Sequence, residues 1–170
     1  MPKAKSQTET GPSRSKRKTE KEKAVLREFR REDFDRIWEI DQECFPPGIA
    51  YPRRVLAAYL AEPGTATLVA ERDGEILGYV VAARGRSETG HIITLDVTAR
   101  ARRAGLGSEL MAAAEARLKA AGCRAVLLET AVDNSAALAF YKRHGYAVLR
   151  TLPRYYEGSV DALLLEKRLA

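Results

Sequence analysis

The sequence predicts a mixed α/β domain whose first half is a largely antiparallel sheet. Two β-rich runs, at residues 65–71 and 76–83, flank an Asp73-Gly74 dipeptide that is typical of a tight hairpin. Further along, apolar residues recur with a period of 3.6 from Ala104, and Gly122 closes the helix that this period predicts. With 170 residues, 45% of them hydrophobic, the chain can bury a sizeable core.

Eight further elements follow from apolar periodicity and from turn residues. Strands are predicted at residues 24–30, 91–97, 125–130, 146–152 and 160–167. Helices are predicted from Arg31 to the residue before Pro46, from Pro52 to the residue before Pro63, and from Asn134 to His144. Trp38 falls on the apolar face of the first helix and is expected in the core.

Most of the positive charge lies in one segment. Residues 1–23 carry eight basic and three acidic side chains, which accounts for +5 of the net charge of +6. A segment so poor in apolar residues cannot compensate for its ordering entropy, so we expect a disordered basic tail. The tail is either a solvated extension or a weak contact for RNA or the ribosome through phosphate groups.

Several classes of protein are disfavoured by composition. The two cysteines, Cys44 and Cys123, and the two histidines give neither a disulfide framework nor the spacing of a zinc site. We therefore expect no metal, and both cysteines as small hydrophobic residues. No run is apolar enough for a membrane span or a signal-peptide core, so we expect a cytoplasmic protein with no membrane partner.

A glycine-rich segment joins the strand at 91–97 to the long helix. Its residues are Arg102, Arg103, Ala104, Gly105, Leu106, Gly107 and Ser108. Free N–H groups at a helix start attract anions, and glycine lets a ligand approach the backbone closely. Taken alone, the segment is equally compatible with a plain turn that enters a helix.

Two motifs together resemble the GNAT acyltransferases. Arg102, Gly105 and Gly107 match the family's (Gln/Arg)-x-x-Gly-x-(Gly/Ala) pyrophosphate motif, and residues 134–146 resemble its Asn-x-x-Ala-x-x-x-Tyr-x-x-x-Gly-(Phe/Tyr) block. The resemblance extends over residues 24–168. It implies one GNAT domain over residues 24–170, with a mixed, mostly antiparallel sheet flanked by helices. It also implies splayed central strands that form a cleft for acetyl-CoA, the co-substrate.

Within that family, the second half resembles ribosomal-protein alanine acetyltransferases and their archaeal counterparts. Residues 127–130, the Arg154-Tyr155-Tyr156 run and the Asp161-Ala162 pair carry this likeness, and residues 90–97 resemble the archaeal branch. It implies acetyl transfer to the α-amino group of a protein N-terminus, on a ribosomal protein or on nascent chains. The chain departs from the pattern at Ser159-Val160, and at Asp96, where a small residue is usual.

The resemblance also assigns catalytic roles. Glu129 would act as a base through water, His91 would be a second candidate base, and Tyr141 would protonate the departing thiolate. Each residue also has a structural explanation. Glu129 fits an exposed strand carboxylate, His91 a satisfied histidine at a strand start, and Tyr141 an aromatic core residue.

Binding roles follow in the same way. Asn134 would hydrogen-bond the cofactor or merely cap its helix, and the backbone of Leu95, Asp96 and Val97 would pair with pantetheine and polarise the thioester. Residues 102–108 would hold the pyrophosphate. Substrate would lie between two aromatic loops, which contribute Phe45, Tyr51, Tyr155 and Tyr156, unless these residues serve only in loop packing.

Two other functions remain compatible with the sequence. One is a GNAT enzyme that acetylates a small-molecule amine or a lysine side chain. The other is a non-catalytic module that binds acetyl-CoA and RNA or the ribosome. The resemblance favours a peptide substrate over a small molecule, because relatives that act on small molecules usually lack the Tyr155-Tyr156 pair, whereas the basic tail favours the binding module.

Overall fold

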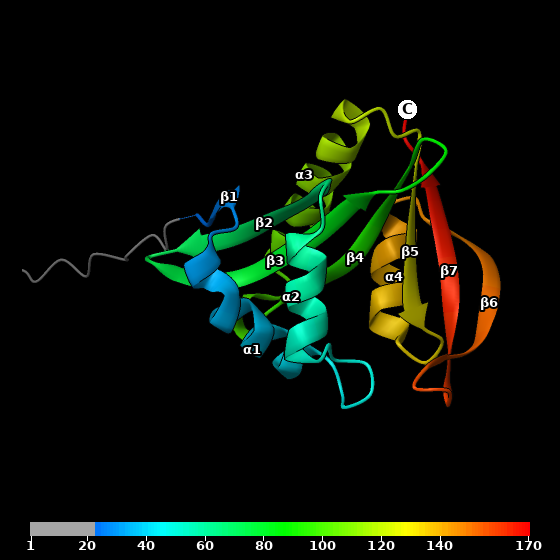
Figure 1. Cartoon of the computed structure of the whole chain (residues 1–170), viewed down its shortest axis with the longest axis horizontal. Coiled ribbons are helices and arrows are strands. Elements are labelled where there is room, and N and C mark those ends of the chain that lie inside the picture. The colour runs from blue at the N-terminus through cyan, green and yellow to red at the C-terminus, as the bar shows by residue number, and fades with distance from the viewer. Residues whose placement is uncertain (1–22) are drawn as a thin grey trace, which may run out of the picture.

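The computed structural model describes residues 23–170, which form an α+β fold with seven strands and four helices in this part of the chain (Figure 1). The strands are β1 (Val25–Glu28), β2 (Thr65–Arg72), β3 (Glu75–Arg84), β4 (Thr89–Val97), β5 (Ala125–Ala131), β6 (Ala147–Tyr156) and β7 (Val160–Arg168). The helices are α1 (Phe34–Cys44), α2 (Arg53–Ala61), α3 (Leu106–Ala120) and α4 (Ser135–Arg143). The basic segment predicted at residues 1–23 lies, apart from Lys23, outside the described residues.

All of the predicted helices and strands are present, and their observed bounds differ from the predicted ones mainly by a few residues at the ends. Helix α3 begins at Leu106 and not at Ala104, because Gly105 caps it with a left-handed φ of +84°. A 3-10 turn at Arg31–Asp33 precedes α1. Strand β6 continues to Tyr156, so the two tyrosines predicted in a loop lie at the end of a strand.

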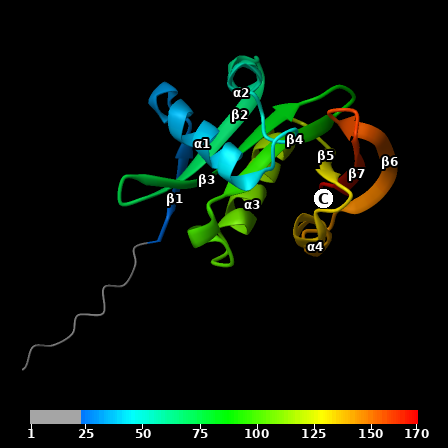
Figure 2. The same cartoon turned by 90° about the horizontal axis from the view of Figure 1, so that it is seen from below.

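All seven strands belong to one sheet in the order β1-β2-β3-β4-β5-β7-β6. Every neighbouring pair is antiparallel except β4 and β5, which run parallel. Seen from below, α1 and α2 cover one face of the sheet, while α3 and α4 lie on the other (Figure 2). The fold class predicted from the sequence is therefore confirmed.

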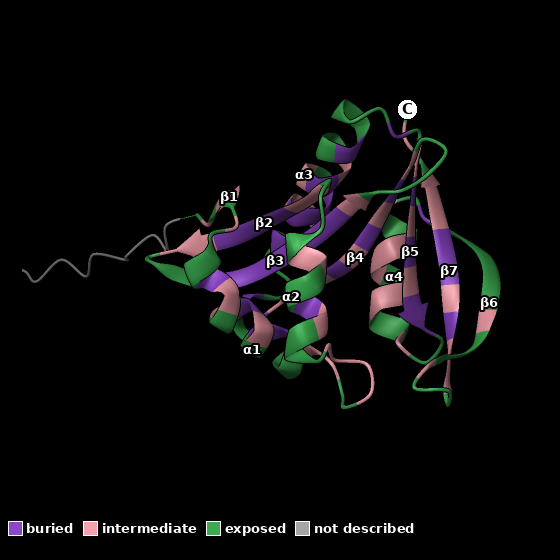
Figure 3. Ribbon diagram, in the orientation of Figure 1, coloured by how far each residue is buried: buried purple, intermediate pink, exposed green. Residues whose placement is uncertain are grey.

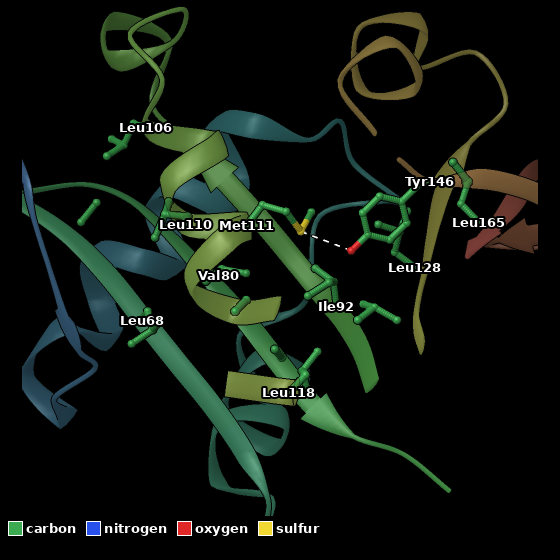
Figure 4. Close-up of a cluster of buried hydrophobic side chains, with 14 of the residues drawn as sticks. Leu68, Val80, Ile92, Leu106, Leu110, Met111, Leu118, Leu128, Tyr146 and Leu165 are labelled. Carbon is green, nitrogen blue, oxygen red and sulfur yellow. Dashed lines mark hydrogen bonds between the residues drawn. The ribbon is translucent and has the colours of Figure 1, made fainter. Parts of the chain in front are cut away.

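Each face of the sheet has its own core. Leu110, Met111 and Leu118 of α3 pack on Val80 and Ile92 (Figure 4). On the opposite face, apolar residues of α1 and α2 bury the other side of the central strands; Ile37, Ile40, Leu56, Val69, Ile76, Tyr79 and Val81 form this second core. Strand β6, at the sheet edge, is largely exposed (Figure 3).

A β-bulge at Ile93 shapes the middle of β4. Val81 pairs with Thr94 and the next residue of β3, Ala82, pairs with Ile92, so Ile93 is the additional residue. Ile92 packs against the α3 core before the bulge, and Leu95 packs against it afterwards. The bulge therefore turns the backbone of the second half of β4 relative to its neighbours, next to the point where β5 separates from it.

The parallel pairing of β4 with β5 is short. It comprises only three residue pairs, of which His91 with Leu127 is the last. Beyond this point β5 continues along β7 to Ala131, whereas β4 continues along β3 to Val97. The two central strands therefore diverge, and the candidate site opens between them.

Candidate active site

A cleft of about 1180 Å³ opens where β4 and β5 separate. Fifteen of the residues predicted from the sequence line it: Phe45, Tyr51, Leu95, Asp96, Val97, Arg102, Arg103, Gly105, Gly107, Ser108, Glu129, Asn134, Tyr141, Tyr155 and Tyr156. Three do not. Leu106 is buried in the α3 core, Ala104 is exposed, and His91 reaches the cleft only through Glu129.

One end of the cleft is built to receive an anion. The first backbone hydrogen bond of α3 joins Glu109 N to Gly105 O, so the N–H groups of Leu106, Gly107 and Ser108 precede the helical ladder. The positive end of the helix dipole lies at the same place, and the side chains of Arg103 and Arg143 line the cleft. A diphosphate fits this donor set.

Arg102 has a different role from its neighbour Arg103. Its Nε donates to Val97 O at 2.9 Å, and its guanidinium also contacts Cys44 Sγ at 3.5 Å. The side chain thus ties the glycine-rich segment to the end of β4. The Cys44 thiol, half-buried and beside the Asp96 carboxyl, has a raised pKa because burial disfavours the thiolate.

The middle of the cleft lies between β4 and α4. Asn134 caps α4, since its Oδ1 accepts a hydrogen bond from Ala137 N at 3.1 Å. Tyr141 makes edge contacts with Phe140 and Tyr146, and its hydroxyl has no hydrogen-bond partner within residues 23–170. Burial raises the Tyr141 pKa well above its ordinary value, so this phenol stays protonated.

The other end holds a histidine and a carboxylate in contact. His91 Nε2 lies 2.5 Å from Glu129 Oε2, and the two side chains are 35% and 17% exposed. His91 is the last residue of β4 that pairs with β5. Its partner there is Leu127, and Glu129 lies two residues further along β5. The divergence of the strands thus places Glu129 at the wall of the cleft, with His91 directly behind it.

Aromatic side chains surround this pair. Tyr51 donates its hydroxyl to Ile93 O at 3.3 Å and contacts Tyr59 edge to face, and Tyr155 and Tyr156 contact each other in the same manner. Burial raises the pKa of Tyr51 and Tyr156, so their hydroxyls are neutral hydrogen-bonding groups. Sequence reasoning missed Tyr59, because it reads as an apolar residue of α2.

Two buried carboxyls stand behind the cleft. Asp41 Oδ2 accepts from Tyr51 N at 2.7 Å and thereby holds the loop that carries Tyr51; burial raises its pKa to about 6. Asp96 is 1% exposed, accepts from Thr94 Oγ1 at 3.1 Å, and has a pKa raised by burial to about 7. Its Oδ2 and the Tyr79 hydroxyl have no hydrogen-bond partner in the described chain.

Sequence reasoning missed three further charged residues that line the cleft. Arg143 follows from the helical spacing of α4, which places it three residues from Phe140. Asp133 and Glu157 occur in turns, where no spacing marks them. Glu157 Oε2 lies 2.7 Å from the place that a Cβ on Gly48 would occupy, so the two loops at the mouth of the cleft touch.

No three His, Cys, Asp or Glu side chains gather closely enough among residues 23–170 to hold a metal ion. No helix within those residues is long and apolar enough to cross a membrane.

Known proteins share this sequence pattern. The acetyltransferase (GNAT) family model matches residues 34–146. An uncharacterised N-acetyltransferase from Methanocaldococcus jannaschii is 34% identical over 145 residues, which cover 85% of this chain and 91% of that protein. An N-alpha-acetyltransferase from Sulfurisphaera tokodaii is 32% identical over 152 residues, covering 82% and 90%.

Solved structures of other proteins have a similar fold. Ard1 from Thermoplasma volcanium superposes with a TM-score of 0.78 at 27% identity, over 86% of this chain and 98% of that one. The ribosomal-protein-S18-alanine N-acetyltransferase from Escherichia coli has a TM-score of 0.76 at 17% identity, over 86% and 94%, which shows a shared fold.

Proposed function

The chain belongs to the GNAT acetyltransferase family, and we propose that it transfers acetyl from acetyl-CoA to the α-amino group of a protein N-terminus. The observation that carries the proposal is the His91–Glu129 pair, which lies at one end of the cleft among tyrosines and opposite the anion-binding end. Relatives about 30% identical are N-alpha-acetyltransferases, which supports the same acceptor.

The acceptor amine must lose a proton before it attacks. An α-amino group has a pKa near 8 and is mostly protonated at neutral pH. Glu129, in contact with His91, accepts that proton through a water molecule, and the imidazole shares the resulting charge. A peptide would approach between Phe45, Tyr51, Tyr155 and Tyr156, whose neutral hydroxyls and ring faces suit a peptide backbone.

The donor would lie along the remaining length of the cleft. Acetyl-CoA supplies an acetyl thioester at one end of its chain and a diphosphate in the middle. The N–H groups at the start of α3, with Arg103, hold the diphosphate. The backbone of Leu95–Val97 pairs with the pantetheine arm and donates toward the carbonyl oxygen as negative charge develops there. Asn134, at the start of α4, orients the same arm.

Tyr141 would assist departure of the sulfur. As the C–S bond breaks and the new C–N bond forms, negative charge grows on the sulfur atom. The Tyr141 hydroxyl, which has no other partner within residues 23–170, donates to that atom as the general acid. Its raised pKa keeps the hydrogen on the phenol, so the hydroxyl stays a hydrogen-bond donor to the sulfur throughout the step.

Release of free CoA tests the proposal. The full chain would be incubated with acetyl-CoA and with peptides synthesised in pairs, one member with a free and one with a blocked N-terminus. Turnover on the free member alone supports the proposal. Turnover only on polyamines or lysine side chains would replace it with another GNAT reaction, and CoA binding without turnover on any amine would indicate a binding module.

A further inference from the structure

His144 lies directly behind the anion-binding end of the cleft. It is the half-buried residue that ends α4, and its ring stacks on Phe140 with 4.1 Å between centroids. Nε2 lies 2.9 Å from Ser108 Oγ, and Nδ1 lies 2.8 Å from Phe140 O. Ser108 lines the cleft, whereas His144 does not. The histidine can therefore influence a ligand only through the serine.

The hydrogen positions follow from the chemistry of the two partners. A carbonyl oxygen only accepts, so Nδ1 must carry a hydrogen to bond Phe140 O. In a neutral ring Nε2 is then an acceptor, and Ser108 donates its hydrogen to it. The serine consequently presents only oxygen lone pairs to the cleft. In a protonated ring Nε2 donates instead, and the Ser108 hydrogen becomes free to turn toward the cleft.

An anion bound in the cleft favours one of these two hydrogen-bond arrangements over the other. A phosphate oxygen repels lone pairs and accepts a hydrogen, so it favours the hydroxyl that points outward. We propose that His144 is a positioning residue that binds the donor's diphosphate through Ser108 and takes up a proton when the donor binds. The proposal concerns the donor end alone and holds whichever amine is the acceptor.

The surrounding charges are consistent with such a proton uptake. The contacts of the ring are Ser108 on α3 and Phe140 on α4, both uncharged. The acids of α3 are occupied elsewhere: Glu109 pairs with Lys23, and Glu115 pairs with Lys167 and Tyr146.

Two further features act on the charge of the ring. Arg143, which precedes His144, is cationic and opposes a second positive charge until an anion neutralises it. The C-terminus of α4 favours a cation at His144. Donor binding would therefore favour the protonated form of the His144 ring.

The experiment is titration of the full chain with CoA by calorimetry at pH 7.5, in buffers of different ionisation enthalpy, which reports the protons taken up. His144→Gln is the decisive variant, because its amide N–H can still donate to Ser108 Oγ but cannot titrate. His144→Leu and Ser108→Ala remove the bond, and Lys142→Ala changes an exposed neighbouring residue as the control.

We expect His144→Gln to bind CoA about as well as the wild type but to take up fewer protons. His144→Leu and Ser108→Ala should each weaken CoA binding about tenfold, and the double variant no further. Turnover with S-acetyl-pantetheine, which lacks the diphosphate, should fall less in Ser108→Ala than turnover with acetyl-CoA does. Equal proton uptake by wild type and His144→Gln, additive losses in the double variant, or equal losses with acetyl-pantetheine would each overturn the proposal.

Discussion

His91 Nε2 and Glu129 Oε2 lie 2.5 Å apart at the point where β4 and β5 stop pairing. The side-chain bond joins the last β4 residue that pairs with β5 to a β5 residue two positions beyond that pair. Since the two side chains are in hydrogen-bond contact, we propose that they act as one unit when the acceptor amine loses its proton. The arrangement places Glu129 at the cleft wall and His91 behind it.

The first prediction concerns this unit. Glu129→Gln and His91→Gln should each lower kcat/KM for a peptide acceptor by about 10² to 10³, because each removes the proton acceptor. The double variant should be little slower than the slower single variant. Steady-state CoA release measures all three, and calorimetry should show unchanged CoA binding. Multiplicative losses in the double variant would mean that the two residues act independently.

The second prediction concerns the Tyr141 hydroxyl. Tyr141→Phe should lower kcat by about 10- to 100-fold, because the sulfur loses its hydrogen donor. The ring contacts with Phe140 and Tyr146 persist in this variant. Loss of the hydroxyl breaks no hydrogen bond within residues 23–170. KM for acetyl-CoA and the melting temperature should therefore change little. An unchanged kcat would remove Tyr141 from the chemistry and leave it as a packing residue.

The third prediction compares two glycines at opposite ends of α3. Gly105 and Gly122 have φ values of +84° and +87°, and a Cβ would meet no atom within 4 Å at either one. Substitution by alanine should cost about 1 kcal/mol of unfolding free energy at both sites, through backbone strain alone. Only Gly105→Ala should also weaken CoA binding, because its strain falls on the backbone that presents the α3 N–H groups.

Urea denaturation and calorimetry with CoA would separate the two effects of that comparison. Gly122→Ala serves as the control for strain. If both variants lost CoA affinity equally, the loss would reflect general destabilisation and not the anion site.

The fourth prediction is a pH dependence of stability at Asp96. Burial raises its pKa in the folded chain to about 7, against roughly 3.9 when unfolded. Between these values the folded state binds more protons, so this carboxyl's contribution to stability falls as pH rises from about 4 to 7. An asparagine has no such dependence and keeps the acceptor for Thr94.

Asp96→Asn should therefore raise the unfolding free energy at pH 8, by on the order of 3 kcal/mol more than at pH 4. Urea unfolding at several pH values measures the difference. Asp33 is a control of opposite sign, since the Arg27 guanidinium lowers its pKa and Asp33→Asn should cost more at pH 8 than at low pH. A pH-independent effect of Asp96→Asn would show that this carboxyl is ionised in the folded protein.

The strand and helix order could be predicted because the signals are local. Alternating β-rich runs, Asp73-Gly74 and the 3.6 period of α3 each act within about a dozen residues. The start of α3 was placed two residues early, because apolar periodicity does not reveal that Gly105 adopts a positive φ. The bulge at Ile93 was missed for the same reason, since it depends on pairing with β3.

The candidate site was predicted from spaced motifs and not from contacts. Glu129, Tyr141 and the segment around Gly105 stand out in the sequence, and the fold brings them to one cleft. The partnership of His144 with Ser108 joins residues 36 positions apart, and no spacing rule marks it. Asp41 shares the helical spacing of Ile37 and Trp38, but no spacing rule shows that its buried carboxyl accepts a hydrogen bond from Tyr51 N.

Transfer to an α-amino group can be tested by locating the acetyl group on a peptide that offers two different amines. A peptide with a free N-terminus and an internal lysine would be acetylated by the full chain with acetyl-CoA, then fragmented by tandem mass spectrometry. We predict a mass increase on the N-terminal fragments alone, and its loss in Glu129→Gln. Acetyl on the lysine side chain, with the N-terminus unmodified, would contradict it.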